Sequence, residues 1–572
     1  MGIRRATKEA TDAETFAVLT PEVRTWFEGK FGTFTPPQRY AVKEIHQGEN
    51  VLISSPTGSG KTLSAFLASL NELFILAKKG ELKDQVYVLY VSPLKALNND
   101  IQRNLKEPLE EIYAAAAARG LDLPQIRVGV RTGDTPQKER AAQSRKPPHI
   151  LITTPESLAI ALVAPKLSLA LHDIRYIIVD EIHSLADNKR GVHLSLSLER
   201  LCARIPKEPV RIGLSATISP MEDAARFLVG LRDGKDRDCL IVDVNFIKDL
   251  DIQVESPVRD LIYTDARTTN LALYKRLDQL ISAHKTTLIF TNTRSATERV
   301  SFHLQKQFGK KYLDDVGAHH SSLSKEVRLD VEQRLKRGEL KVVVSSTSLE
   351  LGIDIGSIDL VALLGSPKSI SRALQRIGRS GHRLHEQSKG RIIVMDRDDL
   401  VECVVLAREA RLRHVDRIHI PMGALDVLAQ HLMGLSLERR WELDEAIALV
   451  RRAYPYKDIT EDEVVRILRY LSGSYEELEA RKVYGKVWFA EESRMFGRRG
   501  RMARPIYYTN IGVIPDEVSA KVMTTNGEVK GKLEEEFVEH LKPGDIFVLG
   551  GTTYEFLKTT GGRVLVEPRP GQ

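Results

Sequence analysis

The sequence predicts two successive α/β lobes, each a parallel β-sheet covered by helices, followed by a helical domain and a C-terminal β-rich module. Short apolar, β-rich runs alternate with longer amphipathic segments, which is typical of a parallel sheet covered by helices. The alternation begins again after the polar stretch Arg232–Asp238, which we interpret as a linker. After about residue 415 the pattern changes to helical segments and then to β-rich runs with Gly- and Pro-containing turns.

The expected elements follow directly from this pattern. Strands of the first lobe are predicted at Val51–Ser54, Val86–Val91, Arg127–Arg131, Ile150–Thr153, Tyr176–Val179 and Arg211–Leu214, and strands of the second at Thr287–Thr291, Lys341–Ser345, Leu360–Leu364 and Arg391–Met395. Helices are predicted at Gly423–Leu437, Leu443–Ala453 and Glu461–Leu471, a set typical of a winged helix. We therefore expect a first lobe at 1–235, a second lobe at 236–415, a winged-helix-like domain at 416–484 and a β-rich module at 485–572.

Composition limits the class of protein. With 42% hydrophobic and 28% charged residues the chain resembles an ordinary globular protein, and it has neither an apolar run long enough to span a membrane nor a signal peptide. Cys202, Cys239 and Cys403 lie far apart, which excludes a four-cysteine zinc or iron–sulfur site and favours a reducing, cytoplasmic location. The net charge of +7 favours a polyanionic partner without proving one.

A glycine-containing loop joins the strand at 51–54 to the next helical segment. Its sequence, Ser55-Pro-Thr-Gly-Ser-Gly-Lys-Thr62, predicts a phosphate-binding loop in which the backbone of Gly58, Ser59 and Gly60 turns toward ATP phosphates. Lys61 would neutralise the β- and γ-phosphates and Thr62 would ligate Mg²⁺. The alternative is a chance Gly/Ser turn, which the flanking strand and helix make improbable.

Two adjacent carboxylates end the strand at 176–179. Asp180 is predicted to hold Mg²⁺ through its water shell, and Glu181 to orient and deprotonate the attacking water. An apolar strand that ends in Asp-Glu is often only a solvated strand end. The phosphate-binding loop earlier in the same lobe favours the catalytic interpretation.

Further motifs occur in the order and spacing of superfamily 2 helicases. They are Thr35–Gln38, Ser92–Asn98, Arg131–Asp134, Thr153–Ser157, Ser215–Thr217, Leu288–Arg294, Ser346–Asp354 and Gln375–Arg383. The acid pair continues as Asp-Glu-Ile-His, and the runs SLELGID and GSPKSISRALQRIGRSGH resemble the large helicase-related (Lhr) family of DExH-type helicases. The resemblance continues through YYTNIGVIPDE, EEFVEHLKPGDIFVLGG and VLVEPRPGQ, and so covers nearly the whole chain.

This resemblance implies two RecA-like lobes that bind ATP and Mg²⁺ in the cleft between them. It also implies 3′-to-5′ translocation on single strands and unwinding of DNA or RNA–DNA duplexes, in DNA repair or recombination, by a monomer without a membrane partner and with unknown protein partners. Gln38 would read adenine; Gly352, Asp354 and Arg379 would complete the nucleotide site, with Arg379 as the arginine finger. His382 takes the place of a second finger, which puts Arg383 in doubt.

The resemblance also implies that a single strand is held through its backbone. The candidates are Lys95, Asn98, Thr154, Thr291, Arg294, His320, Ser321 and Thr347. Ser, Thr and Asn near strand ends also cap helices, which is the alternative for each of them.

The stretch Arg494–Arg504 is rich in arginine, and Arg498, Arg499 and Arg501 are predicted phosphate contacts on a flexible arm. The alternative is a solvated loop, or arginines paired with acids. Trp488 beside it either stacks a base or lies buried.

Two other functions remain open at this point: a nucleic-acid-stimulated ATPase that remodels or anneals without unwinding, and a non-enzymatic nucleic-acid-binding scaffold. Intact Lys61, Asp180, Glu181 and Arg379 argue against the scaffold. The chain ends on a strand and a Pro/Gly turn where the family continues, so we expect a further C-terminal domain to be absent from this sequence.

Overall fold

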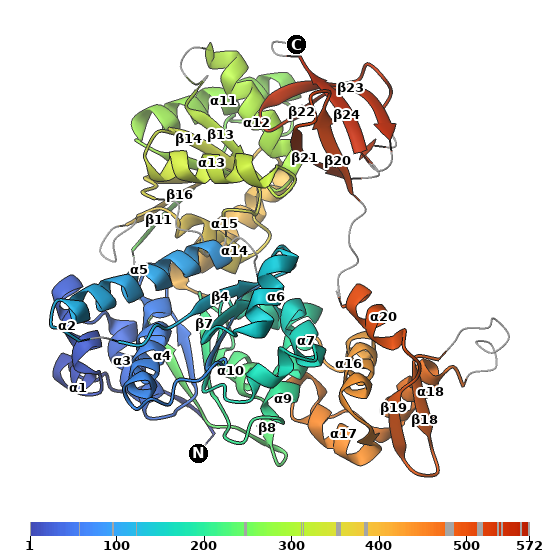
Figure 1. Cartoon of the computed structure of the whole chain (residues 1–572). Helices are drawn as coiled ribbons and strands as arrows, with labels where there is room; N and C mark the ends of the chain where they lie inside the picture. Colours follow the sequence, from blue (N-terminus) through green and yellow to red (C-terminus); the bar gives the residue numbers. More distant parts are fainter. Residues whose placement is uncertain are drawn as a thin grey trace. The chain divides into compact units, whose positions relative to one another are not determined.

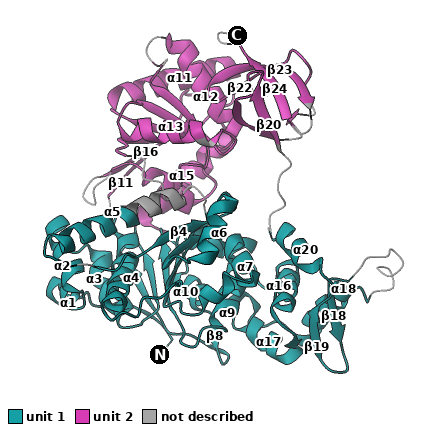
Figure 2. Cartoon of the chain, in the orientation of Figure 1, with its two compact units in different colours: residues 1–55, 59–245, 417–515 teal, residues 56–58, 246–416, 516–572 magenta. Residues whose placement is uncertain are grey.

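A computed structural model of the chain divides into two compact units, which are described separately (Figures 1 and 2). Unit 1 comprises residues 1–55, 59–245 and 417–515, and unit 2 comprises residues 56–58, 246–416 and 516–572. The structure describes residues 2–56, 58–93, 97–121, 123–244, 249–309, 312, 314–350, 356–381, 387–474, 485–511, 519–534, 537–538, 541–560 and 563–569. Among these residues, no helix is both long and apolar enough to cross a membrane.

An eight-stranded parallel sheet forms the first lobe in unit 1. Its strands, in spatial order, are β1 (Ile3–Arg5), β10 (Cys239–Asp243), β2 (Val51–Ser54), β7 (Val210–Ser215), β6 (Tyr176–Val179), β3 (Val88–Val91), β5 (Ile150–Thr153) and β4 (Val128–Arg131). The central strands β2, β3, β5 and β6 are buried along their whole length, as expected for a sheet with helices on both faces.

Each predicted strand of this lobe is present, but the predicted linker is wrong. Leu231–Arg232 and Lys235–Asp236 pair as a small hairpin, β8–β9. The chain then enters β10, whose apolar residues Cys239–Val242 are buried beside β2. The polar stretch is therefore a surface turn, and the first lobe continues beyond residue 235.

A six-stranded parallel sheet forms the second lobe in unit 2. Its strands, in spatial order, are β11 (Leu250–Glu255), β16 (Ser388–Ile393), β15 (Leu360–Leu364), β12 (Thr287–Phe290), β14 (Val342–Ser345) and β13 (Val316–His319). The four predicted strands are present. Both strands that the sequence pattern missed, β11 and β13, lie at the edges of the sheet, where β13 includes a glycine and β11 alternates polar and apolar residues.

Three helices and a small antiparallel sheet form a winged helix within unit 1. The helices are α16 (Leu425–Glu438), α17 (Leu443–Arg451) and α18 (Glu461–Ser472), and the sheet has the order β17 (Trp441–Glu442), β19 (Met495–Arg498), β18 (Val487–Ala490). Val487, Phe496 and Tyr507 share one apolar core with these helices. The predicted boundary at residue 485 is therefore wrong, because β18, β19 and α20 (Ala503–Thr509) belong to the winged helix.

The β-rich module begins at β20 and packs on the second lobe, in unit 2. Its five strands, in spatial order, are β21 (Val529–Glu534), β20 (Ser519–Thr524), β24 (Arg563–Pro568), β23 (Thr552–Thr560) and β22 (Ile546–Leu549). Leu323 of the lobe lies in the core of the module, and backbone hydrogen bonds join Ser324 N to Lys530 O and Lys532 N to Ser322 O.

A buried carboxylate fastens this module to the lobe. Glu298, in α12 (Arg294–Phe308), accepts hydrogen bonds from the backbone N–H groups of Gly550 and Gly551 in the β22–β23 turn. The same carboxylate lies 2.6 Å from Nε2 of His320. One acidic side chain thus satisfies one buried and two partly buried donors from two parts of the unit.

We expect Glu298→Ala to destabilise unit 2 by about 3 kcal/mol, because it leaves these donors without an acceptor. Urea unfolding measures the loss, and amide hydrogen exchange at Gly550 and Gly551 should become faster. Glu528→Ala is the control, because its carboxylate is exposed and pairs only with Lys530 among the ion pairs of the described residues. Equal effects of the two substitutions would contradict the role given to Glu298.

Candidate functional site

The loop between β2 and α4 (Lys61–Lys78) has a backbone shape that glycine favours. Gly58 and Gly60 have φ angles of 77° and 88°, in the left-handed region. Ser55 and Ser59 hydroxyls lie 2.8 Å apart across the loop, and buried Lys61 donates from Nζ to the Ser55 carbonyl at 3.2 Å. The Lys61 ammonium group therefore lies within the loop, at the amino end of α4, where the unpaired backbone N–H groups of a helix favour an anion.

Gln38 lies against this loop. Thr35 and Gln38 form a capping box at the start of α3 (Pro36–His46), in which the Gln38 side chain accepts from Thr35 N at 2.9 Å. A Cβ atom at Gly60 would lie 2.9 Å from Gln38 Nε2 and 3.0 Å from Thr35 Oγ1. Gly60 is thus required by space as well as by its φ angle, because the Gln38 and Thr35 side chains lie where a Cβ atom would be.

Asp180 lies buried at the end of β6. Tyr90 donates its hydroxyl to one oxygen of this carboxylate, and the backbone N–H of Glu181 donates to the other at 2.9 Å. Burial and then the charge of Glu181 raise the pKa of Asp180, while the Tyr90 hydrogen bond and Lys61 oppose the rise. A cation beside this pair of acids would offset the cost of burying their charge.

His183 connects the acid pair to the end of β7. Its Nδ1 accepts from the backbone N–H of Ala216 at 3.2 Å and lies 3.3 Å from the Ser215 hydroxyl. Its Nε2 lies 3.4 Å from Glu181, and because Nδ1 accepts, we assign the ring proton to Nε2. Burial lowers the pKa of His183, so the ring is neutral near neutral pH, and its Nε2 lies beside Glu181 without a hydrogen bond to it. The sequence analysis assigned no role to His183, although it follows the acid pair by two positions.

Backbone strain accompanies this arrangement. Glu181 has φ 48°, in the left-handed region that residues other than glycine rarely adopt. Such a conformation costs about 1–2 kcal/mol and persists only where surrounding contacts hold it. Here the contacts are the Asp180 carboxylate and His183.

The residues that could hold a nucleotide and a divalent cation come together at one edge of the first sheet. The half-buried Thr62 offers a hydroxyl at the start of α4, next to Lys61. Asp180 and Glu181 follow β6, two strands away from β2 in the sheet. Carboxylate and hydroxyl oxygens are the donor set that Mg²⁺ prefers, so the residues fit that ion.

The comparisons with known proteins agree with this geometry. Residues 35–225 match the DEAD/DEAH box helicase family, residues 272–383 the helicase conserved C-terminal domain, and residues 408–572 the winged helix domain of large helicase-related proteins. A solved structure, of Mycobacterium smegmatis helicase Lhr bound to ssDNA and AMP-PNP, is 36% identical with a TM-score of 0.79, over 96% of this chain and 68% of that one. The chain belongs to the Lhr family.

Two Lhr relatives are more similar in sequence. ATP-dependent helicase Lhr-Core protein 2 of Thermococcus barophilus is 63% identical over 100% of this chain and 66% of that protein. ATP-dependent helicase Lhr-Core of Methanocaldococcus jannaschii is 59% identical over 98% of this chain and 65% of that protein. The chain thus spans about two thirds of the length of these curated relatives. The resemblance to Lhr and the predicted fold class are both confirmed.

The nucleic-acid contacts predicted in the first lobe differ in how far the structure describes them. Thr154 is buried at the start of α7 (Pro155–Val163), where its hydroxyl accepts from Ser157 N and caps the helix. Its placement therefore favours the capping alternative. Lys95 and the side chain of Asn98 lie outside the described residues.

In unit 2, Thr347 and Ser321 are exposed and Arg294 is half-buried. Thr291 is buried, with its hydroxyl 2.8 Å from that of Thr297. His320 is only 1% exposed and is held by Glu298, so its ring is not available to a nucleic-acid strand. The prediction that His320 contacts nucleic acid is corrected: it fastens the β-rich module to the lobe.

Arg376 and Arg379, in the Gln375–Arg383 motif, make different contacts. Arg376 is buried, binds Glu350 through Nε and Nη2 at 3.0 Å and lies over the Phe290 ring, which makes it a structural residue. Arg379 donates to the Glu350 carbonyl at 2.9 Å. Gly352, Asp354 and Arg383 lie outside the described residues.

The basic stretch of the winged helix is more ordered than predicted. Met495–Arg498 is strand β19, and Gly497 is buried with its Cα against the ring of Trp488, so this part is no flexible arm. Arg494 pairs with Asp444 and Glu461, which is the alternative that the sequence left open. The three predicted phosphate contacts are exposed: Arg498, Arg499 and Arg501.

The sequence analysis did not identify Arg190, which contacts two of the helicase motifs of the first lobe. It lies in α9 (Lys189–Cys202) and binds both oxygens of Glu156, with Nε 2.6 Å from one of them. It also donates to the Pro93 carbonyl at 2.9 Å. Burial acts to raise the pKa of Glu156, but Arg190 outweighs it and the pKa is lowered. Arg190 thus ties the loop after β3 to the first turn of α7.

We expect Arg190→Lys to weaken single-strand binding about tenfold while leaving ATP binding intact, because an ammonium cannot span Glu156 and Pro93 as the planar fork does. Fluorescence anisotropy with a labelled oligonucleotide measures the first quantity, and nucleotide titration measures the second. Arg466→Lys, on an exposed arginine of α18, is the control. Unchanged affinity of Arg190→Lys for single-stranded nucleic acid would show that the segments at Pro93 and Glu156 keep their positions without the guanidinium group.

Proposed function

We propose that this chain is an ATP-driven motor that moves 3′ to 5′ on single-stranded nucleic acid and unwinds DNA or RNA–DNA duplexes, in DNA repair or recombination. The observation that carries the proposal is the meeting of Lys61, Asp180 and Glu181 at one edge of the first sheet, where His183 connects the acids to β7. The chain's Lhr relatives carry the name ATP-dependent helicase, which supports the same function.

The roles of the site residues follow from their chemistry. Lys61 and the N–H groups of the loop at Gly58–Gly60 bind the phosphates of ATP, and Gln38 reads the adenine. Thr62 and Asp180 would hold Mg²⁺, and the ion would supply charge neutralisation to the phosphates. Glu181 orients the attacking water and accepts its proton, and the neutral His183 ring lies beside that carboxylate. Arg379 as an arginine finger stays a prediction.

We assign the binding of single-stranded nucleic acid to loops that follow the β-strands of both lobes. Exposed Ser321 and Thr347, together with Arg294, offer hydroxyl and guanidinium donors to a phosphodiester backbone. In unit 1, the exposed Arg498, Arg499 and Arg501 of the winged helix offer further guanidinium groups to phosphates. The M. smegmatis relative was solved with ssDNA and AMP-PNP, which supports a strand as the partner.

We expect Glu181→Gln to retain ATP binding and to lose ATP turnover by about 10²-fold or more, because the amide cannot accept a proton from water. Steady-state hydrolysis and a nucleotide titration measure the two quantities. Glu49→Gln is the control, since that carboxylate is partly exposed and pairs with Arg4. Near wild-type turnover in Glu181→Gln would remove Glu181 from the mechanism.

We expect ATP-dependent displacement of a strand from duplexes with a 3′ tail and little from duplexes with a 5′ tail. Binding should weaken with salt, with a log–log slope of about −0.7 for each phosphate contacted on a single strand. DNA, RNA and hybrid duplexes are compared in one strand-displacement assay. ATP turnover that rises with added strand while no duplex opens would favour a remodelling or annealing ATPase, and turnover indifferent to strand would reject a nucleic-acid motor.

A further inference from the structure

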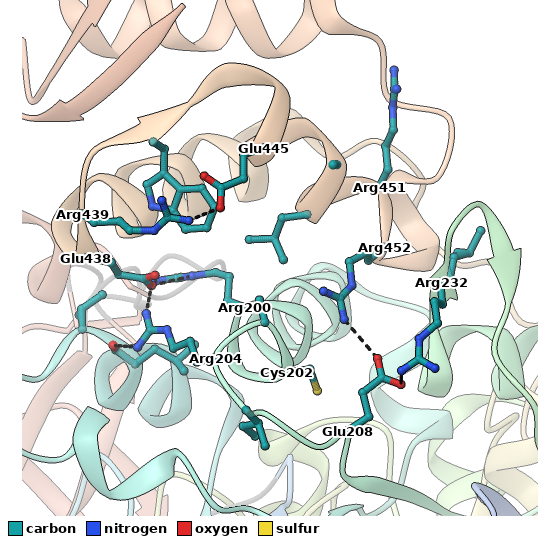
Figure 3. A pocket seen from close by; sticks show the side chains of 18 of the residues that line it. Arg200, Cys202, Arg204, Glu208, Arg232, Glu438, Arg439, Glu445, Arg451 and Arg452 are labelled. Carbon is teal, nitrogen blue, oxygen red and sulfur yellow. Dashed lines mark hydrogen bonds and ion pairs between the residues drawn. The ribbon is translucent and has the colours of Figure 1, made fainter.

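A cavity of about 1250 Å³ lies in unit 1 where the first lobe meets the winged helix (Figure 3). Its lobe side is formed by the end of α9, the segment that follows it and the β8–β9 hairpin. Its other side is formed by the end of α16, β17 and α17. Small-molecule sites commonly have volumes of about 300–1,000 Å³, so this space accommodates a ligand larger than one phosphate ion.

The lining has more positive than negative side chains. Eight lining residues are Arg or Lys, whereas five are Asp or Glu. The carboxylates are also shared: Glu438 binds both Arg200 and Arg204, and Glu208 binds Arg232, Arg237 and Arg452. Several guanidinium groups therefore share Glu438 and Glu208, and the lining retains an excess of positive charge.

Figure 3 places these groups on two sides of the cavity, with Glu438 and Arg204 on one side and Glu208, Arg232 and Arg452 on the other. The guanidinium groups retain access to solvent, because the Arg204, Arg452 and Arg232 side chains are 20%, 29% and 60% exposed. Burial and the neighbouring Arg200 together lower the pKa of Arg204, although Glu438 opposes them.

The cavity is separate from the ATP site. Its residues 202–208 precede β7, whereas the phosphate-binding loop follows β2, which is parallel to β7 and adjacent to it. The two sites therefore lie at opposite edges of the sheet, about 15–20 Å apart along a strand. The loops at Pro93 and Thr154 follow β3 and β5, so they lie at the ATP edge and not at the cavity.

We propose that this cavity binds a small anion with two or more phosphate groups, held between Arg204 on one side and Arg232 and Arg452 on the other. A guanidinium group binds phosphate through two parallel hydrogen bonds, and two separated groups of arginines match a ligand with more than one phosphate. Arg504 also lines the cavity, and within the described residues its Nε has no hydrogen-bond partner. A bound anion offsets the excess positive charge of the cavity lining and so stabilises the packing of the winged helix on the first lobe.

The shared carboxylates permit a variant that removes cations without leaving a buried acid unpaired. In the double variant Arg232→Gln, Arg452→Gln, the Glu208 carboxylate keeps Arg237, and Glu199 keeps Arg211 and Arg237. The double variant should therefore fold with a thermal midpoint equal to or above that of the parent chain. A purely structural ion-pair network predicts the opposite, a clearly lower midpoint.

The test uses the full chain carrying Lys61→Ala, which weakens phosphate binding at the ATP site. Inorganic tripolyphosphate should raise the thermal midpoint of this parent and bind it in calorimetry, and the double variant should bind about tenfold more weakly or not at all. Arg24→Gln with Arg466→Gln is the control, because it removes the same charge from two exposed ion pairs of unit 1. The control should respond to tripolyphosphate as the parent does.

Three results would overturn the proposal. They are the failure of tripolyphosphate to bind the parent, equal binding of tripolyphosphate by the double variant and the control, and a lower stability of the double variant than of the control in the absence of anion. A further arm replaces tripolyphosphate with a short single-stranded oligonucleotide. Protection by the oligonucleotide alone, lost in the double variant, would assign the arginines to the nucleic-acid backbone and reject the small anion. None of these outcomes depends on ATP turnover.

Discussion

The parallel register of the first sheet is the constraint on which the rest of the site depends. Ser54 pairs with Ser215 and Val179 with Gly213, so the loops that follow β2, β6 and β7 leave the sheet at the same edge. Loops at the carboxyl edge of a parallel sheet commonly carry ligand sites. The hydrogen bonds of His183 to the β7 end are possible only because this register brings Ala216 beside the turn after β6.

Buried polar groups recur wherever one part of a unit is fastened to another. Glu298 binds donors from the β-rich module, the half-buried Arg190 joins the loop after β3 to α7, and Arg200 binds Glu438 across the contact between α9 and α16. At Glu298 and Arg200, removal of one partner would leave a buried group without compensation, which is far more costly than the net gain of the bond itself. Such contacts fix position more than they add stability.

The winged helix and the β-rich module are joined in sequence but belong to different units. The winged helix shares unit 1 with the first lobe, through contacts such as Lys189 with Asp426. The β-rich module shares unit 2 with the second lobe, where Leu323 enters its core. Each lobe therefore carries one accessory domain, so a movement of one lobe would also move the domain attached to it.

The sequence by itself determined the order of the lobes, their central strands and the ATP-site motifs, because these depend on local patterns: buried apolar runs, the glycines at 58 and 60, and the adjacent acids at 180 and 181. Tertiary structure alone decided the rest. That β10 joins the first sheet, that β19 belongs to the winged helix and that His320 is buried on Glu298 each depend on contacts between residues distant in sequence. No local pattern encodes such a pairing, since the same polar residue is exposed or buried according to what packs against it.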